Sequence, residues 1–480
     1  MNNKKIRPFV LGAIMTDEWA ASPNMGEGET LGGNKISTLK KIQTAEGTRT
    51  IISGQSVGSW HRQALYDRCG WPVSRLQEVI SGRDTRQFYS QCQPITFAED
   101  DGRGYLAAVS VKDGSKNISM TTKRTSPFMM SQFQSVAPVR IEREFGILAR
   151  GLNETVEENR GSLIFTTEIA AAAYAGMFAL NCSELGVFGV GIGRDLLPFE
   201  QFNNKLPSNY IKAVLSDAPK DDEKALADDV RRALKRCVDK PRDTNLALAA
   251  PERKQRAHDL ISALAELEGG AMQTRRLYNV TPAAAFVAFM DGGNCLPPHI
   301  FRAVPKNPGI PSNRAMIYEI DVERVYRIIC DNAERFIDMG EAEVKTEDGV
   351  TKVKSPNVFF GCLGEPTISK TSEVELIAIL EGRDENRPLP KQVKAKICSG
   401  ARTAIHAAAD ALPESWFECP ENAELIGEQM LFGESLQSKL TPKQEPSEKK
   451  PVKNATKAVE ANPALFSDTN GGEDGNADPS

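Results

Sequence analysis

The segment spanning residues 34–66, NKISTLKKIQTAEGTRTIISGQSVGSWHRQALY, constrains the fold more than any other part of the chain. It reads as basic residues, a short strand and then a helix that opens at Ser53-Gly54-Gln55. Ser53 is a favourable N-cap and Gly70 a favourable stop, and apolar residues recur between them at helical spacing. The apolar stripe consists of Val57, Trp60 and Ala64. The pattern therefore predicts a helix over residues 53–69.

The start of this predicted helix combines chemical groups that suit a phosphate. A helix N-terminus presents unpaired N–H groups and a partial positive charge. Gln55 can donate and accept hydrogen bonds, Arg62 follows two turns later, and three cations precede the helix, namely Lys40, Lys41 and Arg49. The alternative interpretation is that Ser53 is an ordinary cap and the cations are solvated. Trp60 could stack on a base, but its place in the apolar stripe favours core packing.

Two further segments are candidate phosphate contacts. Residues 269–276, GGAMQTRR, place two glycines before polar and basic side chains, so that a backbone could approach closely. The candidate residues there are Gly270, Met272, Gln273, Thr274 and Arg275. Residues 123–127 place the basic pair Lys123-Arg124 before a Ser-Pro turn. The alternatives are a C-cap turn with an exposed basic pair in the first case and surface solubility in the second.

The charge distribution, the cysteine pattern and the hydropathy of the sequence limit the classes of protein to which the chain can belong. The net charge is −5, but residues 1–150 carry +6 and the remainder −11, which indicates a local anionic partner. The nine cysteines are scattered without a Cys-x-x-Cys pair, which favours reduced thiols. None of the four histidines stands at metal-ligand spacing. No apolar run approaches the ~18 residues of a membrane span, so we expect a cytoplasmic protein without a membrane partner.

Composition also divides the chain. A strand is predicted near residues 6–14, and charged, helix-like stretches predict a helical insertion over residues 196–268. From about residue 437 the sequence has almost no aromatic residues and much Pro, Gly, Asn and Asp. This composition predicts a disordered tail over residues 437–480, after a folded part over residues 1–436.

Enzyme motifs match poorly. Residues 26–37, GEGETLGGNKIS, lack the Gly-Lys-Ser/Thr that a P-loop needs. Residues 189–193, GVGIG, have the wrong spacing for a dinucleotide fingerprint. Glu168 stands alone in an apolar run, and such a carboxylate more often satisfies a backbone group or an arginine than it performs catalysis. We therefore expect no catalytic residue, metal or cofactor.

With these residues in view, the chain resembles the Cascade backbone family of CRISPR systems, the crRNA-binding subunits, most closely their DevR-like branch. Five blocks carry the resemblance in order from residue 5 to about residue 290, and the later region matches less clearly. The blocks are Asn24-Met25-Gly26-Glu27-Gly28 with Asn34, Ile52-Ser53-Gly54-Gln55-Ser56, Lys123-Arg124-Thr125-Ser126-Pro127, Thr167-Glu168-Ile169, and Gly269-Gly270-Ala271 with Gln273-Thr274-Arg275.

The resemblance implies an α+β fold, an RRM-like (ferredoxin-like) palm with helical and loop insertions called fingers and thumb. Copies would pack head to tail along a guide RNA and present it for pairing with target DNA, together with other Cascade subunits. Ser53, Gln55 and Lys40 would touch the guide backbone, Arg62 would extend the contact, and Gln273 to Arg275 would add to it. At helix positions where relatives often carry Lys or Arg, this chain has Gly58 and Ser59.

Three other functions remain open at this point. A related RNA-guided subunit could cleave target RNA with an aspartate-assisted step, although no paired acid recommends Asp17 or Asp67 for that role. A metabolic enzyme could use the loop from Gly26 to Asn34 for a phosphorylated ligand. A protein-interaction scaffold with a disordered tail is the third.

Overall fold

The computed structural model describes residues 6–425, apart from residues 27, 32–33, 75, 82–84, 91, 93, 96, 108–109, 114–115, 120, 149–162, 192, 197–244, 271–279, 294–298, 307–315, 347–348 and 366. All described residues belong to one compact unit, Met1–Thr441. Its centre is a sheet that has nine strands among the described residues. They are β1 (Pro8–Thr16), β5 (Lys41–Thr44), β6 (Gly47–Ile52), β13 (Phe128–Met130), β14 (Phe133–Ser135), β17 (Tyr174–Asn181), β20 (Pro282–Asp291), β25 (Val358–Cys362) and β26 (Ala395–Ile397).

The sheet runs in the order β26-β25-β20-β1-β17-β14-β6-β5, and β13 also pairs with β17. Strand β1 lies in the middle, antiparallel to both β17 and β20, and every one of its residues is buried. Its continuous apolar sequence, PFVLGAIMT, is what a strand covered on both faces requires. A Cβ at Gly12 would lie 2.2 Å from the Phe178 ring, so glycine is needed at this crossing.

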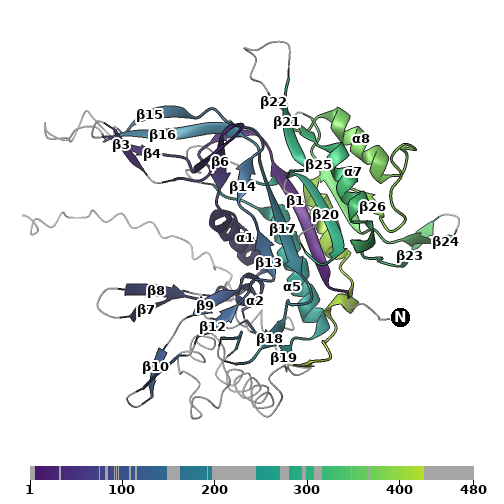
Figure 1. Ribbon diagram of the computed structural model, residues 1–480, viewed down its shortest axis with the longest axis horizontal. Helices are drawn as coiled ribbons and strands as arrows, with labels where there is room; N and C mark the ends of the chain where they lie inside the picture. The colour runs from purple at the N-terminus through teal and green to yellow at the C-terminus, as the bar shows by residue number, and fades with distance from the viewer. Residues whose placement is uncertain are drawn as a thin grey trace, which may run out of the picture. The chain divides into compact units, whose positions relative to one another are not determined.

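Helices cover both faces of the sheet. They are α1 (Gly54–Cys69), α5 (Ala250–Ser262) with its 3-10 extension η2 (Ala263–Glu266), and α9 (Ala401–Asp410) on one face, and α7 (Val322–Asp331) and α8 (Lys370–Leu380) on the other. Figure 1 shows α7 and α8 on one side of β1 and β20, and α1 on the opposite side. Val57, Leu260 and Ile405 pack in the first core, and Ile329 and Leu376 pack in the second.

Chain order relates the central strands to two of these helices. The chain runs from β1 through outer strands to α1, returns through β13 and β14, reverses into β17, passes through α5 and ends in β20. Within the sheet, four of these strands lie side by side in the order β20-β1-β17-β14. Both α1 and α5 pack against the same face. The connections therefore place the first residues of α1 next to the turn between β13 and β14.

Smaller elements surround this sheet. One outer sheet contains β2 (Trp19–Ala21), β3 (Glu29–Leu31), β4 (Asn34–Ser37), β15 (Glu142–Leu148) and β16 (Leu163–Ala172). Paired strands are β7 (Gln77–Ser81) with β8 (Thr85–Tyr89), β9 (Tyr105–Ala107) with β12 (Thr122–Arg124), β10 (Ser110–Asp113) with β11 (Lys116–Ser119), β21 (Phe301–Pro305) with β22 (Met316–Ile320), and β23 (Glu341–Thr346) with β24 (Gly349–Lys354). The remaining elements are β18 (Val187–Gly189), β19 (Asn245–Ala247) and β27 (Ala423–Leu425) in one sheet, α2 (Ala98–Arg103), and the 3-10 turns η3 (Ala333–Arg335) and η4 (Glu414–Phe417).

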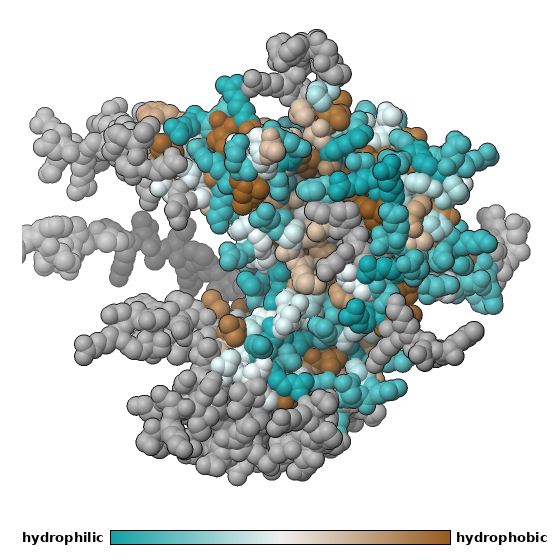
Figure 2. Space-filling model, in the orientation of Figure 1, coloured by the Kyte–Doolittle hydropathy of each residue, from teal (hydrophilic) through white to brown (hydrophobic). Residues whose placement is uncertain are grey.

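The structure confirms the α+β class and the first predicted strand, β1. Of the predicted insertion at 196–268, residues 197–244 lie outside the described residues, and its last part forms α5, which packs in the main core through Ala257, Leu260 and Ile261. The tail predicted over 437–480 also lies outside the described residues. Figure 2 shows a face of mostly hydrophilic residues with scattered hydrophobic ones.

Candidate nucleic-acid interface

Helix α1 begins and ends where its sequence predicts. Ser53 has extended backbone angles (φ −61°, ψ 148°), and its Oγ accepts a hydrogen bond of 3.3 Å from the Ser56 N–H. Gly70 closes the helix in the left-handed conformation at φ 67°, which glycine adopts without a steric penalty. Ser53 and Gly70, which the sequence predicted as the two ends of the helix, are therefore its N-cap and C-cap residues.

The first turn of α1 leaves two backbone donors open. Among the described residues, the N–H groups of Gly54 and Gln55 have no hydrogen-bond acceptor, while those of Ser56 and Val57 are bonded to Ser53. The Gln55 side chain is exposed beside them. Two free N–H groups at the positive end of a sixteen-residue helix attract an anion.

Asn24 holds this helix start in place. Its Oδ1 accepts a hydrogen bond of 3.1 Å from the Ser53 N–H, and its Nδ2 donates one of 2.7 Å to Ser56 Oγ. Its backbone oxygen accepts from the Lys40 N–H at 3.1 Å. Both polar ends of the Asn24 side chain are occupied in this way, so Asn24 acts by positioning α1 and Lys40.

The two lysines before β6 have different surroundings. Lys40 is half-buried, and its ammonium makes no ion pair with any residue that the structure describes. Lys41 instead pairs with Glu168, with 3.1 Å between Nζ and Oε2. Glu168 is 2% exposed and also accepts from the Leu39 N–H at 3.1 Å, with Arg143 at 3.6 Å. Glu168 thus satisfies backbone and cations, as its sequence context predicted, and Lys40 is the cation left for a ligand.

Arg49 and Arg62 were also predicted to contact phosphate, and both bind groups of the protein itself. Arg49 donates to the backbone oxygens of Ser135 and Val136 at 2.6 and 2.7 Å and pairs with Glu46. Arg62 is 39% exposed and pairs with Glu99, so its phosphate contact stays a prediction.

The prediction that Arg124 contacts phosphate is wrong. Its side chain is 3% exposed and pairs with Asp101 and, at 3.1 Å, with Asp195. It also donates to the backbone oxygens of Val187 and Glu184 at 3.0 Å. A cation enclosed by carboxylates and carbonyls stabilises the join between β12 and α2, and solvent does not reach it. Its neighbour Lys123 is exposed on β12 and has no ion pair among the described residues.

The glycine-rich turn lies beside α1. A Cβ at Gly269 would come 2.4 Å from Trp60 Cγ, so the Trp60 ring packs directly on this turn and is not free for stacking. Gly270 has φ 123°, a conformation that favours glycine. The Thr281 hydroxyl donates to the Leu267 oxygen at 3.1 Å and closes the base of the loop. Met272, Gln273, Thr274 and Arg275 lie outside the described residues, and Asn34 is described only as the first residue of β4.

Sequence reasoning missed the segment that faces the helix start. A Cβ at Gly54 would lie 3.6 Å from the Met130 oxygen and 3.7 Å from the Gln132 nitrogen. Ser131 fixes this segment, because its N–H donates to the Met177 oxygen and its Oγ accepts from the Met177 N–H, both at 2.9 Å. No motif marks Ser131 or Gln132, since only the sheet brings them to α1.

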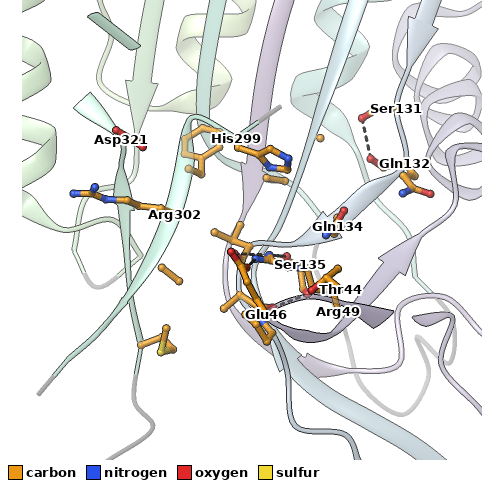
Figure 3. Close-up of a pocket in the computed structure, with 18 of the residues that line it drawn as sticks. Thr44, Glu46, Arg49, Ser131, Gln132, Gln134, Ser135, His299, Arg302 and Asp321 are labelled. Carbon is orange, nitrogen blue, oxygen red and sulfur yellow. Dashed lines mark hydrogen bonds and ion pairs between the residues drawn. The ribbon is translucent and has the colours of Figure 1, made fainter. Parts of the chain in front are cut away.

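A groove of about 880 Å³ opens on the other side of this segment. One wall comes from the β5–β6 hairpin and the strands β14 and β17, and the other from β21, β22 and the start of α7. Figure 3 shows His299 between Arg302 and Asp321 on one side and Thr44, Glu46 and Arg49 on the other. Burial, together with Arg324 and Arg49, lowers the pKa of His299.

Within the described part of the chain, no group of three or more His, Cys, Asp or Glu residues is arranged to hold a metal ion. None of the described helices has both the length and the apolar character needed to cross a membrane.

Comparison with known proteins gives the family. The model of the CRISPR-associated negative auto-regulator DevR/Csa2 matches residues 24–301, more than half of the chain. The chain therefore belongs to the DevR/Csa2 family of CRISPR-associated proteins, and the resemblance seen in the sequence blocks is confirmed.

Solved structures similar to this chain include two from CRISPR assemblies. A chain of a "CRISPR RNA-guided surveillance complex, pre-nicking" is 8% identical, with 84% of this chain and 99% of that chain covered and a TM-score of 0.40. A chain of a "CRISPR RNA-guided surveillance complex" is 11% identical, with 58% and 68% covered and a TM-score of 0.29. No curated protein matches the chain.

Proposed function

We propose that this protein is a guide-RNA-binding backbone subunit of a type I CRISPR surveillance complex of the Cascade kind. The observation that carries the proposal is the start of α1, where the exposed Gln55 and two N–H groups without an acceptor among the described residues lie beside Lys40, which has no ion pair with any of those residues. Membership of a CRISPR-associated family supports RNA as the phosphate-bearing ligand.

The strand order supports an RRM-like palm as the platform for this site. The central strands and helices follow the order strand, α1, strand, strand, α5, strand, and they lie in space as β20-β1-β17-β14. All neighbouring pairs among these four strands are antiparallel. This strand order and these directions match the split β-α-β arrangement of a ferredoxin-like fold and so support the proposed palm. The outer sheets would serve as the fingers and thumb.

The chemistry at the start of α1 fits a ligand of any base sequence. Backbone N–H groups and a lysine bind phosphate and sugar oxygens, which carry no sequence information. A guide-holding subunit needs this property, because every guide has a different sequence. Several copies packed head to tail would repeat the contact along the guide and leave its bases for target DNA. Other subunits would complete the complex in the cytoplasm, and the subunit itself would catalyse no reaction.

The alternative functions find less support. Asp17 accepts hydrogen bonds of 2.8 Å from the Thr367 hydroxyl and from the Glu18 N–H, and Asp67 accepts from the Gln63 side chain at 2.9 Å. Neither aspartate stands at the start of α1. RNA cleavage opposite a bound guide would favour an RNA-cleaving subunit, and a nucleotide-induced melting shift without co-purifying RNA would favour a metabolic enzyme.

The proposal is tested by expressing the chain with its companion genes and a CRISPR array and by sizing the RNA in the purified particle. We expect a uniform band of guide length that depends on the array. A purified chain that carries no nucleic acid, or RNA of random length with and without the array, would refute the proposal.

A further inference from the structure

The groove beside Ser131 and Gln132 collects positive charge from segments that are distant in sequence. Arg49 comes from β6, His299 and Arg302 from the β21 region and Arg324 from the first turn of α7. His299, Arg302 and Arg324 are all exposed. Arg324 and Arg49, which add to the effect of burial in lowering the pKa of His299, lie on opposite walls of the groove.

The carboxylates in the groove are already engaged. Glu46 pairs with Arg49, and Asp321 caps α7 by accepting from the Arg324 N–H at 3.1 Å. Arg302 pairs with Glu319 at 3.1 Å on the solvent side. The Arg324 guanidinium has no ion pair with a described residue, and neither does His299. Among the described residues, Arg324 is therefore unpaired, and the exposed Arg302, which gives its Nε and Nη2 to Glu319, keeps its Nη1 for an external anion.

The groove shares a wall with the start of α1. Ser131 and Gln132 line the groove, and the same two residues lie against Gly54. A strand that leaves the free N–H groups of α1 across these residues would meet Arg324 and Arg302 next. The side-chain amides of Gln132 and Gln134 add hydrogen-bond donors on this wall. A volume of about 880 Å³ in an open groove suits a length of chain.

We propose that this groove carries the next stretch of the guide RNA, with Arg324 and Arg302 contacting its phosphates after the start of α1. This inference rests on the proposed function and extends it to residues beyond the β13–β14 turn. The ligand that fits these cations and amide donors is the sugar-phosphate backbone of single-stranded RNA. An acidic segment of a neighbouring copy would be a protein interface, which the experiment separates.

The test uses the full chain, freed of nucleic acid at high salt, and a fluorescein-labelled single-stranded RNA of mixed sequence. Fluorescence anisotropy gives Kd at several salt concentrations, and each phosphate contact contributes about 0.7 to the slope of log Kd against log salt. The double variant Arg302→Gln/Arg324→Gln should lower this slope by about 1.4. The matched control is Arg327→Gln/Arg383→Gln, which removes two exposed arginines that pair with Glu323 and Glu381 outside the groove.

The outcomes are distinct. A lower slope in the groove variant with an unchanged slope in the control supports the inference. A wild-type slope in the groove variant, or an equal fall in both variants, overturns it while leaving the proposed function standing. Loss of self-association in sedimentation without RNA, with an unchanged slope, would also overturn it and assign the groove to a neighbouring copy. A wild-type chain that binds no RNA would remove the proposed function itself.

Discussion

Lys40 and Arg124 are both cations next to sequence blocks of the family, yet their surroundings give them different roles. Arg124 is enclosed by Asp101, Asp195 and two backbone oxygens, whereas Lys40 has no ionic partner among the described residues. Breaking a buried ion pair costs about 3–5 kcal/mol, so Arg124 stays bound to the protein. A basic residue in a motif is thus a phosphate ligand only where the fold leaves it unpaired.

His61 gives a pH dependence that reports on the packing of α1. Its ring stacks on Phe128 with 4.7 Å between centroids, and its Nε2 lies 2.8 Å from the Leu260 oxygen. Burial and the nearby Arg103 hold the pKa of His61 well below its usual value of 6.5. The folded protein therefore holds the His61 ring in its neutral form. The contribution of this ring to folding stability is fully present above its unfolded-state pKa and decreases as the pH falls below that value.

We expect the free energy of unfolding to fall by up to about 1.4 kcal/mol per pH unit below pH 6.5 because of His61. Urea unfolding at a series of pH values measures this slope. His61→Gln should lose it, and His406→Gln, which changes a half-buried histidine on α9, should keep it. An equal slope in the wild type and in His61→Gln would contradict this assignment.

At the scale of elements, local sequence information determined what could be predicted. Helix α1 carries its N-cap, apolar stripe and C-terminal glycine within eighteen consecutive positions, Ser53 to Gly70, and its bounds were predicted correctly. Residues 77–81, by contrast, form β7, and their conformation depends on pairing with β8. Pairing with a partner strand outweighs the weak helical preference of so short a segment.

Asn24 links Ser53 and Ser56 through two side-chain hydrogen bonds, and substitutions of Asn24 should affect folding stability and RNA binding differently. Asn24→Ala loses both side-chain hydrogen bonds and should destabilise the protein by about 1–3 kcal/mol. Asn24→Asp keeps the acceptor for the Ser53 N–H, and its negative charge favours the positive end of α1. The same charge repels phosphate, so Asn24→Asp should retain stability and lose RNA affinity.

Urea unfolding and RNA anisotropy on the same samples measure both effects. An aspartate variant that binds RNA as tightly as the wild type would contradict the place of Asn24 beside the RNA. The alanine variant is the comparison, because it removes both side-chain hydrogen bonds of Asn24 without adding a charge.

At the scale of the whole molecule, the family resemblance implied the α+β fold, but nothing in the sequence indicated the groove or its walls. Ser131, His299 and Arg324 are far apart in the chain and meet only because β14, β17 and the β21–β22 pair lie around one end of the sheet. The start of α1 could be recognised because its chemistry is contiguous in sequence. The segment opposite it, Met130 to Gln132, could not, since its position depends on the pairing of β13 and β17.

The most direct test of the account compares RNA retained by two variants purified from cells that express the companion genes and a CRISPR array. Lys40→Glu/Gln55→Glu places three added negative units at the start of α1, and Lys391→Glu/Gln392→Glu makes the same change at an exposed lysine and glutamine elsewhere. We predict that the first variant folds and retains at least ~10-fold less guide RNA per protein than the wild type, and that the second retains the wild-type amount. Equal, wild-type amounts of RNA on both variants would contradict the claim that the start of α1 binds the guide.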